Sequence, residues 1–230
     1  MKMPFLIRAI CFVCAVWLMV LECPAQTQNA VPSGAPPAPA ARKANARPDI
    51  PARTSAEPFD GAKVERMAAQ CVKLETEAGT IEMEMLAEAA PETVRNFLNL
   101  AASGAFDTTT FTRVVKGFVI QGGNLATRQT LTPALIERMQ RTIADEPNYV
   151  KHVPGVVSMA RPQQDNAATT SFFILVSEAI HLDGKFSAFG RVTRGMEVVE
   201  VINNAPAVAE KPDKPVRVNR AVIAPCVRPL

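Results

Sequence analysis

The sequence predicts a mainly-β domain, built as a barrel or a sandwich, that follows a leader and a linker at the N-terminus. From Cys71 onward, short apolar runs recur between Gly- and Pro-bearing breaks, which is the pattern of many short strands joined by turns. Near the start of this part, apolar residues alternate with charged ones, as they do in a strand with one buried face. Helical periodicity interrupts the strands in a few places, and no repeat of fixed length is present.

Residues 1–25 have the features of a secretory signal peptide. Lys2 and Arg8 precede an apolar run at residues 9–21, and Ala25 provides a small residue at a cleavage point. The run is shorter than the roughly 20 apolar residues that a membrane-spanning helix needs. We therefore expect cleavage and a periplasmic or secreted protein. An uncleaved leader, which would hold the chain at a membrane, is the alternative.

Residues 26–58 form an Ala/Pro-rich segment with scattered basic residues and almost no large apolar side chains. Such a segment cannot bury enough apolar surface to offset the loss of chain entropy, so we expect a flexible tether. The folded domain is then residues 59–230. The leader and the tether hold the basic excess that gives the chain its formal net charge of +3, so the domain is formally neutral. A neutral domain gives no electrostatic reason to expect a nucleic-acid partner.

Two of the five cysteines, Cys71 and Cys226, lie in the predicted domain, near its opposite ends. In an exported protein an even pair of cysteines is a candidate disulfide. No metal-type spacing accompanies them, so a zinc site is the weaker alternative. The residues alone leave both the bonded and the free form open, because they do not place the two side chains.

The first elements of the domain are predicted to be a hairpin and a helix. In TIEMEML, Ile81, Met83 and Met85 alternate with glutamates, and EAG separates this run from the preceding CVKLET. The segment 91–104 then predicts a helix, with proline at its first position and glycine at its C-terminal cap. An apolar stripe at i, i+3, i+4 and i+7 supports this helix: Val94, Phe97, Leu98 and Ala101.

The rest of the domain alternates between apolar strands and short helical runs. One helical run, TPALIERMQRTI, begins with Thr132 as a candidate N-cap and Pro133 at the first helical position. A second, GMEVVEVI, is short and amphipathic. Six runs have the composition of strands: FTRVV, GFVIQ, GVVSMA, SFFILV, FSAFGRV and VRVNRAVIA.

The inventory of reactive residues excludes several enzyme classes. His152 and His181 are the two histidines of the chain, and neither belongs to a catalytic or metal-binding pattern. The chain has no GxSxG, HExxH, P-loop or GxGxxG motif. It therefore gives no sign of a serine hydrolase of that kind, a zinc protease or a nucleotide-binding enzyme. The sequence predicts neither a metal nor another cofactor.

One apolar stretch carries two polar residues that a core strand would not need. FTRVVKGFVIQGGN, residues 111–124, places an arginine and a glutamine among aromatic and branched side chains. Together with SMAR, SFFI and LDGK…FG, in the same order and at the expected distances, it resembles the signature of the cyclophilin-type peptidyl-prolyl cis-trans isomerases. PETVRNFLNLA is similar to the family's first helix. The resemblance covers about residues 71–223, and the leader resembles that of exported bacterial members.

The resemblance implies the family's fold, a closed eight-stranded antiparallel β-barrel capped by two α-helices. This fold agrees with the many short strands and the few helices predicted from the residues. Its first and last strands lie close together, which favours a bridge between Cys71 and Cys226. The resemblance also implies an enzyme that isomerises Xaa-Pro bonds of polypeptide clients without a cofactor. With the export signal, we expect it to assist protein folding in the cell envelope, as a monomer.

Residue by residue, the resemblance assigns roles around a proline-binding groove. Arg113 would donate to the prolyl nitrogen, which gains a lone pair as rotation removes amide conjugation. Phe118 and Phe173 would form the walls of the pocket for the proline ring, and Leu182 would complete it. Gln121 would bind the substrate backbone and hold Arg113 in place, since a planar guanidinium can serve two partners at once.

Five further groove positions follow from the same resemblance. Ala160 matches the family's small residue in the peptide groove, whereas Val119 replaces a methionine or leucine. Phe186 replaces a histidine or tyrosine, and Ser171 replaces a glutamine that reaches the substrate backbone. His181 replaces a tryptophan that supports cyclosporin binding in sensitive members, so we expect weak cyclosporin binding. Val119 and Ser171 also support an alternative hypothesis, a peptide-docking chaperone or scaffold that has lost efficient turnover.

Overall fold

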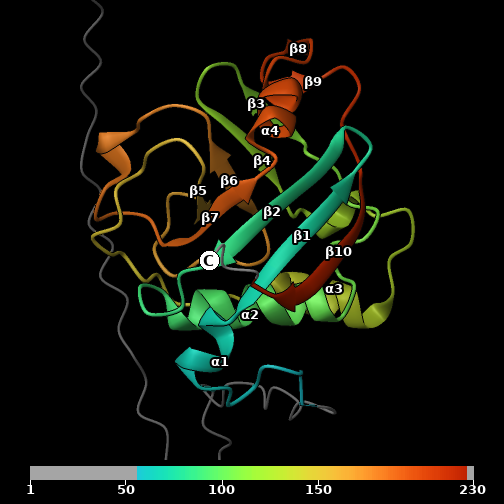
Figure 1. The fold of residues 1–230 in the computed structure, drawn as a ribbon. Coiled ribbons are helices and arrows are strands. Elements are labelled where there is room, and N and C mark those ends of the chain that lie inside the picture. The colour runs from blue at the N-terminus through green and yellow to red at the C-terminus, as the bar shows by residue number, and fades with distance from the viewer. Residues whose placement is uncertain (1–55, 227–230) are drawn as a thin grey trace, which may run out of the picture. The chain divides into compact units, whose positions relative to one another are not determined.

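A computed structural model describes residues 56–226, so the predicted leader and nearly all of the predicted tether lie outside the described residues. The described part contains an eight-stranded antiparallel sheet with the strand order β10-β1-β2-β7-β5-β6-β4-β3 (Figure 1). A second, two-stranded sheet pairs β8 (Ala207–Val208) with β9 (Lys211–Pro212). The strands of the large sheet have these bounds: β1 Gln70–Thr76, β2 Gly79–Met85, β3 Arg113–Val115, β4 Val119–Gly122, β5 Val156–Met159, β6 Phe172–Leu175, β7 Ala188–Arg194 and β10 Val218–Pro225.

The large sheet curls so that its edge strands, β3 and β10, approach each other without pairing along their length. Backbone hydrogen bonds join the segments that begin these strands. The N–H groups of Thr108 and Phe111 donate to carbonyl groups in residues 216–218, at 2.8 and 3.0 Å. The mainly-β architecture with eight strands is therefore confirmed, whereas full closure of the barrel stays a prediction.

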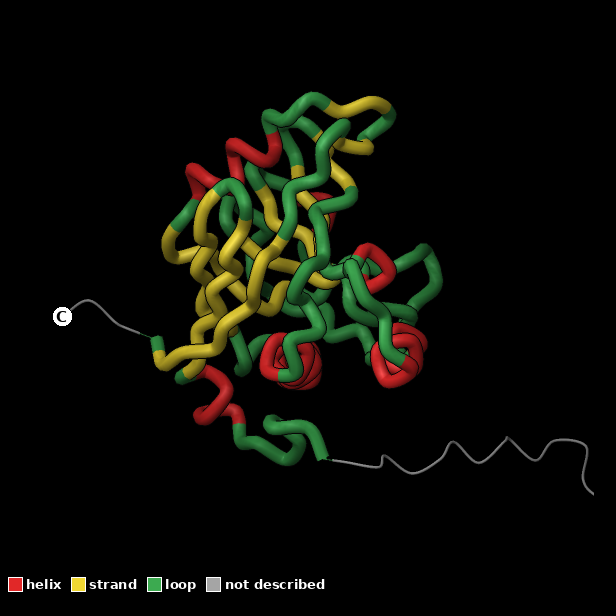
Figure 2. The backbone as a smooth tube through the Cα atoms, turned by 90° about the vertical axis from the view of Figure 1, so that its right-hand side faces the viewer, coloured by secondary structure: helices red, strands yellow, loops and turns green. Residues whose placement is uncertain are grey.

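Four α-helices accompany the sheet in the described residues: α1 Val64–Ala68, α2 Pro91–Ala102, α3 Pro133–Gln140 and α4 Met196–Asn203. Figure 1 shows α2 below the strands and α4 above them, as expected for two helices that cap the sheet. Helix α2 contacts β7 and β10, while α4 contacts β2, β3 and β4. In Figure 2 the β8–β9 hairpin stands at the top of the domain, far from α2. No described helix is both long and apolar enough to cross a membrane.

The local predictions for the first elements are confirmed. Strands β1 and β2 form an antiparallel hairpin, and the alternating residues Ile81, Met83 and Met85 are buried. The predicted apolar stripe of α2 is buried as well. At the start of α3, the side chain of Thr132 accepts a hydrogen bond from the N–H of Leu135 at 3.3 Å, which makes Thr132 the N-cap.

Strand β6 separates the main core from the opposite face of the sheet. Phe172 lies in the core, where its ring makes edge contacts with the rings of Phe97 (5.3 Å) and Phe106 (5.6 Å). The next residue, Phe173, belongs to a separate apolar cluster, because side chains alternate between the two faces of a strand. Gly123 lies against Phe172 with a φ of 80°, and a Cβ there would come within 2.8 Å of that ring. This position therefore requires glycine.

A disulfide joins Cys71 and Cys226, whose Cα atoms lie 4.9 Å apart. Cys71 belongs to β1 and Cys226 follows β10, and these two strands pair along their whole length. Strand pairing thus brings together two cysteines that are 155 residues apart in the sequence. Closing so long a loop stabilises a folded chain by roughly 2–5 kcal/mol.

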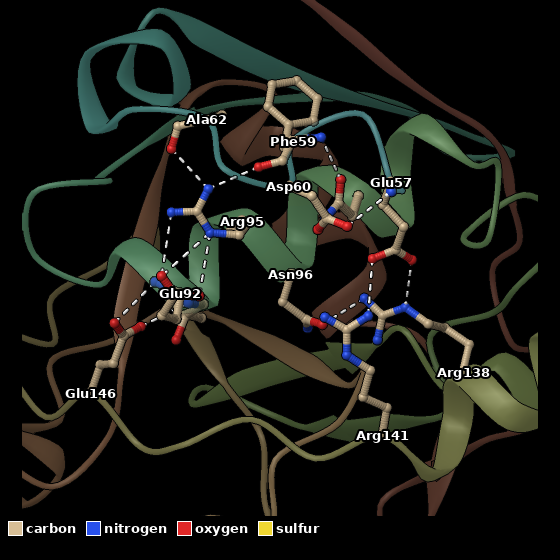
Figure 3. A network of polar contacts seen from close by, with 12 residues as sticks. Glu57, Phe59, Asp60, Ala62, Glu92, Arg95, Asn96, Arg138, Arg141 and Glu146 are labelled. Atoms are coloured by element: carbon tan, nitrogen blue, oxygen red, sulfur yellow. Dashed lines mark hydrogen bonds and ion pairs between the residues drawn. The ribbon is translucent and has the colours of Figure 1, made fainter. Parts of the chain in front are cut away.

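Ion pairs and hydrogen bonds attach the N-terminal segment of the domain to α2 and α3 (Figure 3). The carboxylate of Glu57 pairs with Nε of Arg138 and with Nη1 of Arg141, each at 3.0 Å. From α2, Nη1 of Arg95 donates to two backbone carbonyl groups of the same segment, each at 2.8 Å. Glu57 lies two residues before the predicted start of the domain, so these contacts begin within the last residues assigned to the tether.

The buried side chain of His152 anchors a short 3₁₀ turn, η2 (Ile180–Leu182). The backbone N–H of His152 donates to Oδ1 of Asp183 at 2.8 Å, and Nδ1 lies 3.1 Å from the same oxygen. Burial of the imidazole lowers the pKa of His152 below its ordinary value, and the Asp183 carboxylate offsets part of this shift. The backbone N–H of His152, assisted by Lys151, lowers the pKa of Asp183 to about 2.

These shifts predict that the domain becomes less stable as the pH falls. A group whose pKa is lower in the folded state binds protons more readily when unfolded, so protonation favours unfolding. For His152 the loss begins near its ordinary pKa of roughly 6.5, and for Asp183 it begins near roughly 3.9. We expect the melting temperature to fall by a few degrees between about pH 7.5 and about pH 5.

Thermal unfolding of the His152→Gln variant across the same pH range tests this expectation. The variant is expected to show a flatter dependence of melting temperature on pH, whatever its absolute stability. Arg191→Gln, which changes an exposed side chain on β7, is the control and should keep the parental slope. If the melting temperature of His152→Gln depends on pH as steeply as that of the parental chain, His152 is not the group responsible for the loss of stability between about pH 7.5 and about pH 5.

Candidate active site

Pairing of β3, β4 and β6 places three predicted site residues in one row across the sheet. Arg113 of β3 lies opposite Gln121 of β4, and Gln121 lies opposite Phe173 of β6. Residues directly opposite each other in an antiparallel sheet point to the same side. The row therefore lies on the side of Phe173, away from the main core.

The guanidinium of Arg113 has two partners, and its side chain is 42% exposed. Nε donates to Oε2 of Glu210 at 2.7 Å. Nη1 donates to Oε1 of Gln121 at 3.5 Å, so the expected contact between Arg113 and Gln121 is present but long. Glu210 lies 97 residues away in the sequence and had not been expected at the site.

Phe118 lies in the turn between β3 and β4, and a buried asparagine fixes this turn. Asn203, the last residue of α4, accepts a hydrogen bond from the N–H of Gly117 at 2.8 Å. Its amide donates to the carbonyl groups of Val115 (2.9 Å) and Val119 (3.1 Å). Asn203 is only 3% exposed, and the three hydrogen bonds of its side chain restrict the conformation of the turn. The position of Phe118 therefore depends on α4.

Two aromatic pairs line the apolar part of the site. The ring of Phe118 lies 5.8 Å from that of His181, and the ring of Phe173 lies 6.0 Å from that of Phe186 in an edge arrangement. Leu182, in η2, is buried beside them. The His152–Asp183 contacts that hold η2 therefore also position this wall.

The ten predicted site residues line a single cavity of about 410 Å³. Its walls combine an apolar part with a few polar and charged groups, which is the composition expected of a small-ligand site. The cavity is concave and accessible, since His181 is exposed at its edge. The predicted residues that line it are Arg113, Phe118, Val119, Gln121, Ala160, Ser171, Phe173, His181, Leu182 and Phe186.

Four residues line the cavity that the sequence had not singled out: Arg161, Pro162, Ala167 and Thr169. They extend the cavity along the loop between β5 and β6. Arg161 forms ion pairs with Asp145 (3.0 Å) and Asp165 (2.9 Å), and its guanidinium lies 5.3 Å from the centre of the Phe186 ring. Arg161 is the last residue of the SMAR motif, Pro162 follows it, and Thr169 lies two residues before SFFI, so their position in or near recognised motifs was the available signal.

Two arrangements that could suggest other chemistry do not form a second reactive site. Nε2 of His152 lies 3.3 Å from Oγ of Ser158, and Nδ1 faces Asp183, so the three residues are connected as in a hydrolytic triad. Ser158 is fully buried and does not line the cavity, so a substrate cannot reach its hydroxyl. Among residues 56–226, no cluster of three or more His, Cys, Asp or Glu side chains could hold a metal ion.

Comparison with known proteins agrees with this geometry. The family "Cyclophilin type peptidyl-prolyl cis-trans isomerase/CLD" matches residues 71–223. Peptidyl-prolyl cis-trans isomerase A of Dickeya dadantii is 33% identical over 164 residues, covering 66% of this chain and 83% of that protein. Peptidyl-prolyl cis-trans isomerase-like 1 of Neurospora crassa is 35% identical over 158 residues, covering 68% and 94%.

Solved structures give the same result. A cyclophilin-type isomerase of Cryptosporidium parvum superposes with a TM-score of 0.61 at 28% identity, covering 69% of this chain and 99% of that one. A structure of the same protein in the presence of the dipeptide Ala-Pro gives a TM-score of 0.59 at 29% identity, covering 67% and 98%. The sequence match, the relatives and the curled eight-stranded sheet agree, and this chain belongs to the cyclophilin-type peptidyl-prolyl cis-trans isomerases.

Proposed function

We propose that the cavity around Arg113 is the site at which this isomerase rotates Xaa-Pro bonds of exported polypeptides. The observation that carries the proposal is a guanidinium held at the edge of an apolar cavity lined by all ten predicted residues. A positive charge beside a pocket for an apolar ring is what the reaction requires. The family membership of the chain supplies the reaction class, and the residue roles that follow are part of the proposal.

The chemistry follows from the electronic structure of the amide. Rotation about an Xaa-Pro bond passes a barrier of roughly 18–20 kcal/mol, because the twisted state loses resonance between nitrogen and carbonyl. In that state the prolyl nitrogen regains a lone pair that can accept a hydrogen bond. Arg113 donates to this nitrogen and therefore stabilises the twisted state more than either planar state. No bond to the enzyme forms, and no cofactor is needed.

The other cavity residues hold the substrate while its amide rotates. Phe118, Val119 and Leu182 receive the proline ring together with Phe173, and they displace water from it. Phe186 supports Phe173 by the edge contact between their rings. The cavity holds the proline ring while the preceding residue rotates about the Xaa-Pro bond. Binding energy is thereby used to favour the twisted state of this bond.

The peptide backbone on either side of the proline lies along the polar parts of the cavity. Gln121 hydrogen-bonds the substrate backbone, and Ala160 leaves room for the chain. Ser171 is shorter than the glutamine it replaces, so this part of the cavity is wider and holds the peptide less tightly. The structure of a Cryptosporidium parvum relative in the presence of Ala-Pro supports a proline-containing peptide as the ligand class.

The site of action that we propose is the cell envelope, as a monomer in the periplasm or outside the cell. The predicted leader at residues 1–25 and the Ala/Pro-rich tether support export. The Cys71–Cys226 disulfide supports it independently, since disulfides persist in oxidising compartments. The clients are proline-containing polypeptides, and the formally neutral domain argues against nucleic acid.

Substitution of Arg113 tests the assigned mechanism. Arg113→Ala is expected to lower the catalysed rate of cis-trans exchange in a short proline peptide by about 10²–10³, because it removes the donor to the prolyl nitrogen. The rate is measured with the purified chain by exchange NMR. Arg191→Ala, at an exposed position on β7, is the matched control and should keep the parental rate.

Three outcomes of this assay are distinct. If the parental chain is no faster than buffer yet binds the peptide, the chain is a peptide-docking module, as Val119 and Ser171 would favour. If the parental chain is fast and Arg113→Ala is equally fast, the isomerase stands and the role of Arg113 is wrong. Loss of rate in Arg113→Ala alone supports the mechanism.

Cyclosporin sensitivity is expected to be limited by His181. The imidazole offers a smaller ring at the edge of the cavity than the tryptophan of sensitive family members, and it is exposed. His181→Trp is expected to tighten cyclosporin binding about tenfold through added aromatic contact, measured by inhibition of peptide exchange. Arg191→Ala, at an exposed position on β7 outside the cavity, is the control. Equal inhibition of the parental chain and His181→Trp would contradict this account.

Export predicts a defined mature N-terminus. Cleavage after Ala25 leaves Gln26 as the first residue, which N-terminal sequencing of the protein from fractionated cells would detect. The expected result is a chain that begins at Gln26 in the envelope or the medium. A chain that begins at Met1 in the membrane fraction would support an uncleaved anchor, and a cytoplasmic chain would contradict the proposed location.

A further inference from the structure

The turn of the β8–β9 hairpin brings a carboxylate to the catalytic arginine. We propose that Glu210 is a positioning residue that fixes the orientation of Arg113 for catalysis. This inference rests on the proposed function of Arg113, and it assigns a role to a hairpin that follows the last helix and contributes no residue to the cavity wall. It would make the carboxylate a part of the isomerase site that acts through another residue.

The distances make Glu210 the dominant partner of Arg113. The Nε–Oε2 contact measures 2.7 Å, within the range of strong charge-assisted hydrogen bonds. The contact from Nη1 to Gln121 measures 3.5 Å and is weak. Among the described residues, Nη2 has no hydrogen-bond partner. Glu210 thus holds one edge of the guanidinium and leaves donors for the substrate.

The backbone of the hairpin is docked onto the strand that carries Arg113. The N–H of Val114 donates to the carbonyl group of Glu210 at 2.8 Å. The hairpin is itself closed by pairing of Ala207 with Pro212 and of Val208 with Lys211. Because the backbone of Glu210 is fixed beside Arg113, few side-chain conformations are open to Glu210, and its carboxylate lies within hydrogen-bond distance of Nε.

The conformation of the turn supports a role for the side chain of Glu210. Its two turn residues, Ala209 and Glu210, have φ angles of 49° and 64°. Such left-handed conformations favour glycine and asparagine, and they are unfavourable for residues with a larger side chain. A glutamate at this position therefore opposes the local preference of the backbone. Residues held in such conformations cluster at functional sites.

Two opposing effects decide the sign of the contribution. The carboxylate partly cancels the positive field of Arg113, but both side chains are nearly half exposed, at 42% and 49%, so water screens this effect. Without Glu210, a long side chain with four rotatable bonds would populate many orientations, and only some would meet the prolyl nitrogen. Loss of the fixed orientation of Arg113 lowers the rate of the catalysed rotation directly. This loss outweighs the stronger positive field that Arg113 would have without the carboxylate.

Substitutions in the full chain separate positioning from structural support. Glu210→Gln keeps the shape of the side chain and removes its charge, and we expect kcat/KM for a short proline peptide to fall about fivefold, through kcat. Glu210→Gly relieves the unfavourable φ, so it should match or exceed the parental melting temperature while losing the same activity. Asp213→Asn removes one charge from the same exposed segment away from Arg113, and it should leave the rate unchanged.

Side-chain NMR of arginine Nε–H groups provides the second readout. The resonance of Arg113, assigned by its absence in Arg113→Ala, should exchange slowly with solvent in the parental chain and rapidly in Glu210→Gln. If Glu210→Gln and Glu210→Gly both keep the parental kcat/KM, the positioning role of Glu210 is wrong, while the proposed isomerase activity of the chain is unaffected. The role is also wrong if Nε–H exchange is the same with and without Glu210. If Glu210→Gly has both a lower activity and a lower melting temperature than the parental chain, Glu210 has only a structural role, and the inference is wrong.

Discussion

Backbone pairing among β3, β4 and β6 determines the geometry of the candidate active site. The ladder places Arg113, Gln121 and Phe173 in one row, so a cation, an amide and an aromatic ring share one face of the sheet. Because side chains alternate with a period of two, a shift by one residue would turn Arg113 away from the cavity. Strands as short as the three residues of β3 are sufficient because their neighbours are fixed by the aromatic core on the other face.

The segment from α4 to β9 holds the two parts of the site in place. Asn203 binds the turn that carries Phe118, and Glu210 binds Arg113. The apolar pocket and the cation therefore depend on neighbouring contacts made by one continuous stretch of chain. Asn203 and Glu210 restrict the side chains of the candidate site although neither lines the cavity. A site that acts through electrostatic interactions requires such fixed placement of its charged and apolar groups.

Local patterns in the sequence were sufficient for much of the fold. The alternation in β2 and the apolar stripe of α2 report which face of one element is buried, and the structure agrees with both. The family resemblance of FTRVVKGFVIQGGN, SMAR, SFFI and LDGK…FG was sufficient to name ten of the fourteen residues that line the cavity, because each of the ten lies in or beside one of these stretches.

Contacts between distant segments could not be predicted in the same way. Glu210 meets Arg113 across 97 residues, and nothing in the sequence AVAEKP marks its glutamate as a partner. Asn203 likewise sits at the end of an amphipathic helix, where an asparagine is ordinarily read as a cap. The short helix α1 escaped prediction because its five residues lack a full period of the apolar pattern.

The disulfide has a further consequence for the way in which the sheet meets other molecules. Strand β10 is an edge of the large sheet, and edge strands are the parts of a β-protein that detach and pair with a second chain. The bond from Cys226 to Cys71 ties the end of this strand to its neighbour, so β10 cannot leave without taking β1 with it. The covalent link thus opposes strand exchange between copies of the protein at the end of β10, where detachment of the strand would otherwise begin.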